Sequence, residues 1–174
     1  YPFAPLQMSP INTLTVGIPS FFLALEANYR KPEGRFLPSV LENSVPAAIT
    51  VIFNIVIIQL AGMAFNLPMI DTSTMSVLLT GTVGFILLYK VSRPLNWKKG
   101  VMIILLIGAF VGIMVLFKGF FGYSGLFNRN VFFYMPLMYS SLRMFGRINQ
   151  FVVIAESKFI NWRKSRKAKQ LKKA

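Results

Sequence analysis

Residues 101–117 read VMIILLIGAFVGIMVLF, a run without a single charged side chain. Helices at the surface of soluble proteins keep one polar face, and this run has almost none. A membrane-spanning helix needs about 20 mostly apolar residues, because the hydrocarbon core is about 30 Å thick and each residue rises about 1.5 Å. The stretch therefore predicts a transmembrane helix. A soluble, all-helical protein with unusually apolar core helices is the alternative.

Similar apolar stretches recur on both sides of this one. The predicted spans cover residues 6–25, 44–65, 72–89, 100–117 and 125–145. The last of them has Arg129 and Arg143 near its ends, where long arginine side chains can reach the lipid headgroups. We therefore predict an all-α, polytopic transmembrane bundle of about five spans. It occupies residues 1–156 and is followed by a basic tail over residues 157–174.

The chain of 174 residues combines 55% hydrophobic residues with a net charge of +14. Nucleic-acid-binding proteins share such a charge but not the positive mean hydropathy, so we expect no nucleic-acid partner. The chain has no Cys and no His, which excludes thiol catalysis, disulfides and metal ligation by these side chains. The composition favours a membrane protein, and it lacks side chains on which most classes of enzyme depend.

Connections rich and poor in basic residues alternate along the chain, and cytoplasmic loops are enriched in Lys and Arg. Residues 28–43 hold three basic side chains and residues 90–99 hold four, whereas residues 66–71 hold none. We therefore predict that Tyr1 lies outside, that the C-terminus is cytoplasmic, and that at least one further span precedes this chain. The tail ends in WRKSRKAKQLKKA at residues 162–174, which suits anionic lipids. We favour a basic anchor with no further role, and a regulatory tail is the alternative.

The first span, PLQMSPINTLTVGIPSFFLALEAN at residues 5–28, mixes amides, hydroxyls, Gly and Pro into an apolar stretch. Pro19 has no N–H to donate, so carbonyls near Thr15 lose a helical partner, and we predict a helix break near Gly17 and Pro19. Freed carbonyls and the oxygens of Asn or Thr suit hard cations, and such backbone survives in lipid where it lines a polar cavity. A Pro-kinked helix that bonds to neighbouring helices is the alternative.

The order of residues in this span resembles the sixth membrane helix of the cation-transporting P-type ATPases, in the branch that includes calcium pumps. In that family the helix runs Pro, apolar, Gln, then Asn, two apolar residues, Thr-Asp-Gly and Leu-Pro. Here the chain reads PLQ at residues 5–7, NTLTVG at residues 12–17 and Pro at residue 19. The later spans then correspond to helices seven to ten. The resemblance covers nearly the whole chain, although only the first span carries a motif.

The resemblance implies that Asn12 and Thr15 supply oxygens to a transported cation, with calcium as the first candidate. Val16 stands where the family has a carboxylate, which argues against two calcium sites of the best-known kind. In the full-length protein, further N-terminal helices and cytoplasmic domains would use ATP, Mg²⁺ and a phosphorylated aspartate. This chain has no Asp-Lys-Thr-Gly motif, so we expect no cofactor in this part. The alternatives are a secondary transporter or channel subunit, and a structural membrane subunit without an ion site.

Polar side chains also occur in the second and third spans. Asn54 and Gln59 either bond a neighbouring helix or belong to a transport path. Residues 80–84, TGTVG, favour a closely packed face, because their hydroxyls can bond to their own backbone and their glycines allow close approach.

Overall fold

The computed structural model describes residues 4–25, 36–93, 95–125, 135–152 and 154, and every regular element among them is helical. Residues 135–152 form the last described helix. The all-α fold is therefore confirmed. The elements before that helix are α1 (Pro5–Asn12), the π-helical η1 (Thr13–Gly17), α2 (Ile18–Leu25), α3 (Phe36–Ala64), α4 (Met69–Val91), α5 (Trp97–Leu116) and α6 (Lys118–Phe121).

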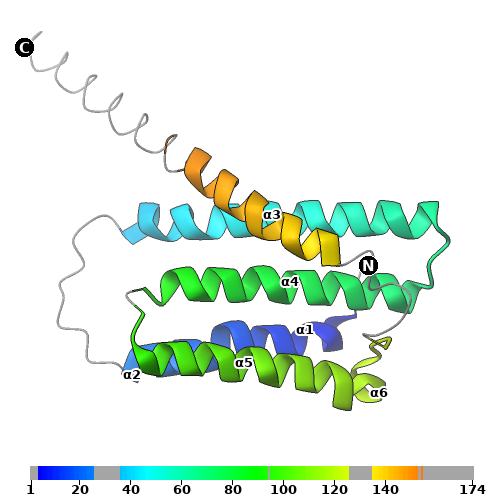
Figure 1. Cartoon of the computed structure of the whole chain (residues 1–174), viewed down its shortest axis with the longest axis horizontal. Coiled ribbons are helices and arrows are strands. Elements are labelled where there is room, and N and C mark those ends of the chain that lie inside the picture. The colour runs from blue at the N-terminus through cyan, green and yellow to red at the C-terminus, as the bar shows by residue number, and fades with distance from the viewer. Residues whose placement is uncertain (1–3, 26–35, 94, 126–134, 153, 155–174) are drawn as a thin grey trace, which may run out of the picture.

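The long helices run back and forth beside one another (Figure 1). α4 lies in the middle, with α3 and helix 135–152 on one side and α5 with the α1–η1–α2 span on the other. The start of α1, the turn after α3 and α6 lie at one end of the bundle, which we call the α6 end. The end of α2 and the start of α5 lie at the opposite end, which we call the α2 end.

α4 is the core helix of the bundle. In its most apolar stretch 50% of the residues are buried, against 22% in the first span and in α5. Val77 and Leu79 are 0% exposed and Val83 is 1% exposed. Side chains of α4 thus meet protein on several sides, whereas the outer helices turn one face away from the bundle.

Glycines bring the neighbouring helices into close contact with α4. A Cβ atom placed on Gly62 of α3 would lie 2.6 Å from Thr72 Cγ2, and one placed on Gly81 of α4 would lie 2.6 Å from Phe110 Cζ of α5. Lipid tails are as apolar as Leu, so helices associate in a membrane largely through such close packing. The closely packed face expected at residues 80–84 is present.

Four helices are long and apolar enough to cross a membrane: Pro5–Leu25, Val40–Ala64, Met69–Val91 and Trp97–Leu116. The chain is a multi-pass helical membrane bundle. Its helices extend past the charge-free windows of the sequence: α4 includes Asp71 in its first turn and Lys90 in its last, and α5 begins before Lys98. A charged side chain near a helix end limits the lipid-embedded length of the helix rather than the helix itself.

The fifth predicted span, residues 125–145, falls partly on residues 126–134, which lie outside the described residues. The helix that follows packs on α3 and α4 through Leu137, Met138 and Phe145. Its role as a fifth span stays a prediction. The basic tail over residues 157–174 lies outside the described residues as well.

Near Gly17 and Pro19, where we predicted a helix break, the first span has a π-helical segment, Thr13–Gly17. The N–H of Ile18 donates to the carbonyl of Thr13, five residues back. The next residue, Pro19, has no N–H to return the chain to the α-helical pattern at once. The first span therefore stays continuous but is locally widened, and single π-helical turns inside α-helices frequently mark functional sites.

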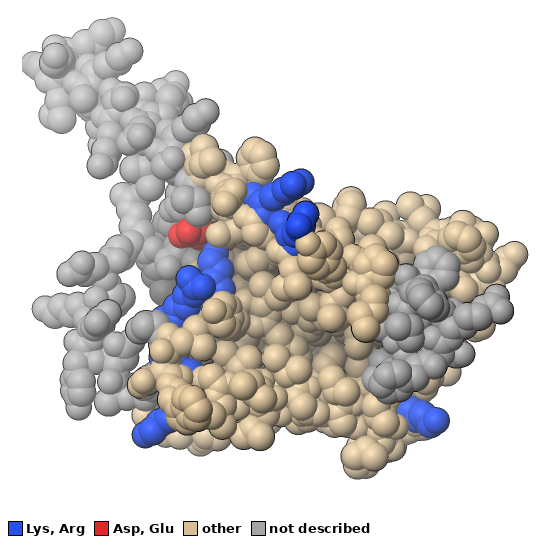
Figure 2. Space-filling view, viewed as in Figure 1, with Lys and Arg blue, Asp and Glu red and all other residues tan. Residues whose placement is uncertain are grey.

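Basic side chains of the described residues gather toward the α2 end (Figure 2). Lys90 and Arg93 stand at the end of α4, and Lys98 and Lys99 stand in the first turn of α5. Lys118 belongs to α6 at the opposite end. The charge of the described bundle is therefore strongly asymmetric along the helix axes.

Candidate cation site on the first span

Thr15 lies within η1 and is half-buried against α4. Its Oγ1 donates a hydrogen bond to the carbonyl of Ile11 over 2.7 Å. On the other side of the residue, a Cβ atom placed on Gly84 would lie 2.9 Å from Thr15 Cγ2 and 3.3 Å from Oγ1. The hydroxyl uses its proton in the bond to Ile11, so the lone pairs of Oγ1 remain available to a cation.

Asn12 lies at the end of α1 and its side chain is exposed on the described bundle. It makes no capping hydrogen bond to η1. A Cβ atom placed on Gly17 would be in contact with the carbonyl oxygen of Asn12, at 3.8 Å. This distance is ordinary van der Waals contact, so the amide oxygen of the exposed Asn12 side chain is the candidate ligand at this residue.

Between Asn12 and Gly17, the exposed side of the first span includes polar groups. Asn12, Thr13 and Gly17 are exposed, and Val16 is 59% exposed. A polar group left without a partner in hydrocarbon costs several kcal/mol, so irregular or polar surface at membrane depth is tolerated where it meets protein or water. Thr15 thus contacts α4 on one side and stays partly exposed, whereas Asn12 is exposed.

Pro19 is fully buried, whereas Gly17 lies on the exposed side of the span. The proline withholds a backbone donor, and its ring is enclosed within the bundle. The two residues at which we predicted a helix break thus have different surroundings, and the π-helical segment ends at Gly17.

The oxygens assembled here are neutral. Among the described residues, no three His, Cys, Asp or Glu side chains come together to hold a metal ion. Amide, hydroxyl and carbonyl oxygens are suitable ligands for hard cations, but affinity for divalent ions rises with the number of carboxylates. The described residues can therefore form part of a cation site, and any carboxylate would have to come from outside them.

Asp71 is placed differently from its expected position in a loop. It lies in the first turn of α4 and is 7% exposed, where the helix dipole favours a negative charge. The polar side chains that follow it are buried too, and Ser76 Oγ donates to the carbonyl of Thr72 over 2.8 Å. The run DTSTMS at residues 71–76 is the sequence signal for this buried polar turn.

A hydrogen-bond network at the α6 end was not foreseen from the sequence. Gln7 Nε2 donates to the carbonyl of Gly122 over 2.8 Å, and the Tyr123 hydroxyl donates to the carbonyl of Gln7 over 2.8 Å. The N–H of Ser124 donates to Thr74 Oγ1 over 2.8 Å. Burial raises the pKa of Tyr123 to about 12. The network ties the start of the first span to α4 and to the segment after α6.

Asn54 bonds to a neighbouring helix, which is the first of the two roles that we expected for it. Its Nδ2 donates to Ser141 Oγ over 2.8 Å, and Ser141 Oγ lies 3.1 Å from Asn54 Oδ1. Both residues are buried, at 2% and 1% exposure. Asn54 therefore joins α3 to helix 135–152, and Gln59, which is half-buried, has no part in this bond.

The chain is similar to a curated protein named probable cation-transporting ATPase exp7, from Streptococcus pneumoniae serotype 4. The two are 26% identical over 111 residues, which make up 64% of this chain and 14% of the relative. The chain thus spans a small part of the length of that relative. No family model matches the chain, and no solved structure matches it. The similarity supports the resemblance to a membrane part of a cation-transporting ATPase.

Proposed function

We propose that this chain is the C-terminal part of the membrane domain of an ATP-driven cation pump of the P-type. In this proposal its spans are helices six to ten of the pump, and the first span contributes ligands to the transported cation. The observation that carries the proposal is the similarity to a probable cation-transporting ATPase, joined to a polar, π-helical first span inside an apolar bundle.

The proposed ligands are the side-chain oxygens of Asn12 and Thr15. Support comes from the exposure of Asn12, from the bond that leaves the Thr15 lone pairs available, and from the widened helix between them. Helices upstream of this chain would pack on the exposed face and complete the site. Discontinuous membrane helices that use freed backbone and polar side chains are a recurring way to bind ions in transporters.

Calcium is the first candidate for the cation, by resemblance. Val16 adds no charge at the position of the expected carboxylate, so a divalent ion would depend on acids from the missing helices. A single site is therefore favoured over two in this part of the pump. Manganese, magnesium and monovalent cations are the other substrates to compare in an assay.

ATP and Mg²⁺ would act in other parts of the full-length protein. The 174 residues contain no Asp-Lys-Thr-Gly sequence, and the described residues do not gather carboxylates for Mg²⁺. The proposal therefore assigns the nucleotide site to other parts of the full-length protein. Their role in the pump is to bind the cation and to support the helices that move around it.

The proposed orientation places the α2 end on the cytoplasmic side. The basic side chains of the described residues gather there, in agreement with the preference of Lys and Arg for cytoplasmic loops. Tyr1 then lies outside and the C-terminus lies in the cytoplasm. Anionic lipids at the basic tail remain part of this proposal.

The test is cation uptake by the full-length protein in sealed vesicles. A pump takes up the cation only when ATP and Mg²⁺ are supplied, and it forms an acid-stable phosphoprotein in the same preparation. A secondary transporter or channel, the second candidate, moves the cation down an imposed gradient without ATP. Uptake that follows the gradient and ignores ATP would overturn the proposed function.

A further inference from the structure

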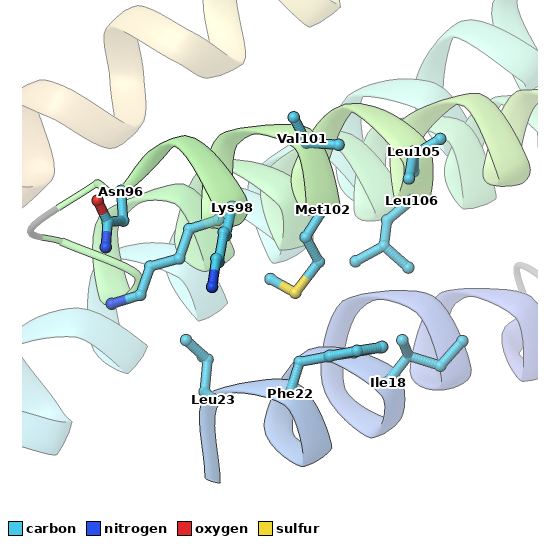
Figure 3. A pocket seen from close by; sticks show the side chains of 10 residues that line it. Ile18, Phe22, Leu23, Asn96, Lys98, Val101, Met102, Leu105 and Leu106 are labelled. Carbon is cyan, nitrogen blue, oxygen red and sulfur yellow. The ribbon is translucent and has the colours of Figure 1, made fainter. Parts of the chain in front are cut away.

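The bundle has a groove between α2 and α5 near the α2 end, with a volume of about 440 Å³. Phe22 and Leu23 of α2 face Met102 and Leu106 of α5 across it (Figure 3). Sites for small molecules have volumes of about 300–1,000 Å³. The groove is open to the outside of the bundle, because Phe22 is 53% exposed and Leu105, which also lines it, is 67% exposed.

One end of the groove is strongly polar, unlike its walls. Asn96, Lys98 and Lys99 line that end, and the other lining side chains are all apolar. The three residues belong to the N-terminus of α5, where Asn96 makes no side-chain capping bond and the first turn contains no acid. The first N–H groups of a helix lack intrahelical partners and carry partial positive charge.

Two lysines at the positive end of a helix dipole are placed against the usual preference for acids there. An anion bound at this point would be attracted by the lysine ammonium groups and by the helix end. Trp97, the first residue of α5, is 85% exposed, and Trp side chains mark the headgroup level of a membrane. The cationic end of the groove therefore lies at headgroup depth, while its apolar walls extend toward the hydrocarbon.

We infer that the groove binds an anionic glycerophospholipid, with its phosphate at Lys98 and Lys99 and one acyl chain between α2 and α5. We choose this occupant because its charge complements the lysines. The order of the two environments fits as well, since the cations lie at headgroup depth and the apolar walls extend toward the hydrocarbon. Under the positive-inside rule the lipid comes from the cytoplasmic leaflet. The inference depends on the membrane fold alone and does not require the chain to be part of a pump.

The experiment measures lipid retention by the full-length protein, purified in a nonionic detergent with phosphatidylglycerol and phosphatidylcholine in equal amounts. Native mass spectrometry counts the lipids that remain bound. The test variant carries Lys98→Gln and Lys99→Gln, and the groove variant carries Leu105→Trp. The control variant carries Lys118→Gln and Arg143→Gln, which remove the same charge away from the groove.

The unmodified protein should retain phosphatidylglycerol in preference to phosphatidylcholine. The test variant should lose this preference by about thirtyfold, because it lacks two basic side chains and each attracts anionic lipid by about 1 kcal/mol. Leu105→Trp should lower the retention of both lipids, and the control should retain them as before. Thermal unfolding in the same detergent identifies any variant that fails to fold.

Two results would overturn the inference. If the control loses the preference as strongly as the test variant, the effect is one of total charge and not of a site. If the unmodified protein shows no preference between the two lipids, the groove holds no anionic lipid. A groove covered by another segment of the full-length protein would give this second result.

Discussion

Thr15 lies directly against Gly84 of α4, so that a Cβ atom on residue 84 would be 2.9 Å from Thr15 Cγ2. The threonine has no freedom to move aside without cost, because its Oγ1 donates to the carbonyl of Ile11 over 2.7 Å and a β-branched side chain is restricted at χ1. The contact therefore fixes the position of the candidate ligand relative to the core helix.

Gly84→Ala should displace Thr15 and weaken cation binding. The added methyl group overpacks the contact, which costs about 1–3 kcal/mol of folding free energy, and it turns Oγ1 away from its place. We expect a lower melting temperature and a higher half-saturating concentration of cation in the ATPase assay. Gly108→Ala on α5 is the matched control, because a Cβ atom there would meet nothing within 4 Å. Equal behaviour of the two variants would contradict the account.

Val16→Asp should raise the affinity for divalent cations. Val16 is 59% exposed, so the new carboxylate does not have to be buried among apolar side chains of the described bundle. A charged ligand strengthens binding of a hard divalent ion, and we expect about a tenfold gain relative to a monovalent cation. Val16→Asn is the control for shape, because Asn has nearly the same size as Asp but carries no charge. A variant whose preference between divalent and monovalent cations does not change would show that residue 16 lies away from the ion.

Asn54 and Ser141 should show a coupling energy that reflects their hydrogen bond. Interhelical bonds of this kind in membranes are worth about 0.6–2 kcal/mol. A double-mutant cycle compares the unfolding in detergent of Asn54→Ala, Ser141→Ala and the double variant. Its coupling energy should fall in that range. Cation transport should retain its dependence on cation concentration in both single variants. A shift in that dependence would instead place Asn54 on the transport path.

The stability of the protein should fall at high pH because of Tyr123. Burial raises the pKa of Tyr123 from 10.0 to about 12, so the unfolded chain loses this proton first. The contribution is complete below pH 10 and is lost as the pH rises toward 12. A shift of this size corresponds to about 3 kcal/mol at most. In Tyr123→Phe, melting temperatures recorded across this range should fall less steeply, and an unchanged slope would exclude Tyr123 as the cause.

The sequence predicts the spanning helices well because the property that defines them, length without charge, is local. It does not predict where each helix ends: Asp71 and Lys98 lie inside helices that the charge-free windows left shorter. Polar residues inside the first span predict an irregular helix, but the geometry of the backbone decides that it becomes a π-helical segment. Nothing local predicts that Gln7 bonds to Gly122, because their meeting depends on how the whole bundle packs.

The same limit applies to the candidate site. Asn12 and Thr15 follow from residue types and their order, whereas the contact of Thr15 with Gly84 requires the packing of the first span on α4. The sequence gives no sign of which side of the span Asn12 occupies, because the π-helical segment shifts the register of the faces. In our proposal, the ligands that complete the site come from residues beyond those described.

The cation-dependent ATPase activity of the full-length protein shows whether the first span binds the transported cation. Asn12→Ala and Thr15→Val should each raise the half-saturating cation concentration by about tenfold, because each removes one oxygen ligand. Thr82→Val is the control, since Thr82 Oγ1 makes the same kind of bond, to the carbonyl of Leu78 over 2.9 Å, away from the site. If Asn12→Ala and Thr15→Val both keep the cation dependence of the unmodified protein, as Thr82→Val should, the first span is only a packing helix and its proposed role as a ligand is wrong.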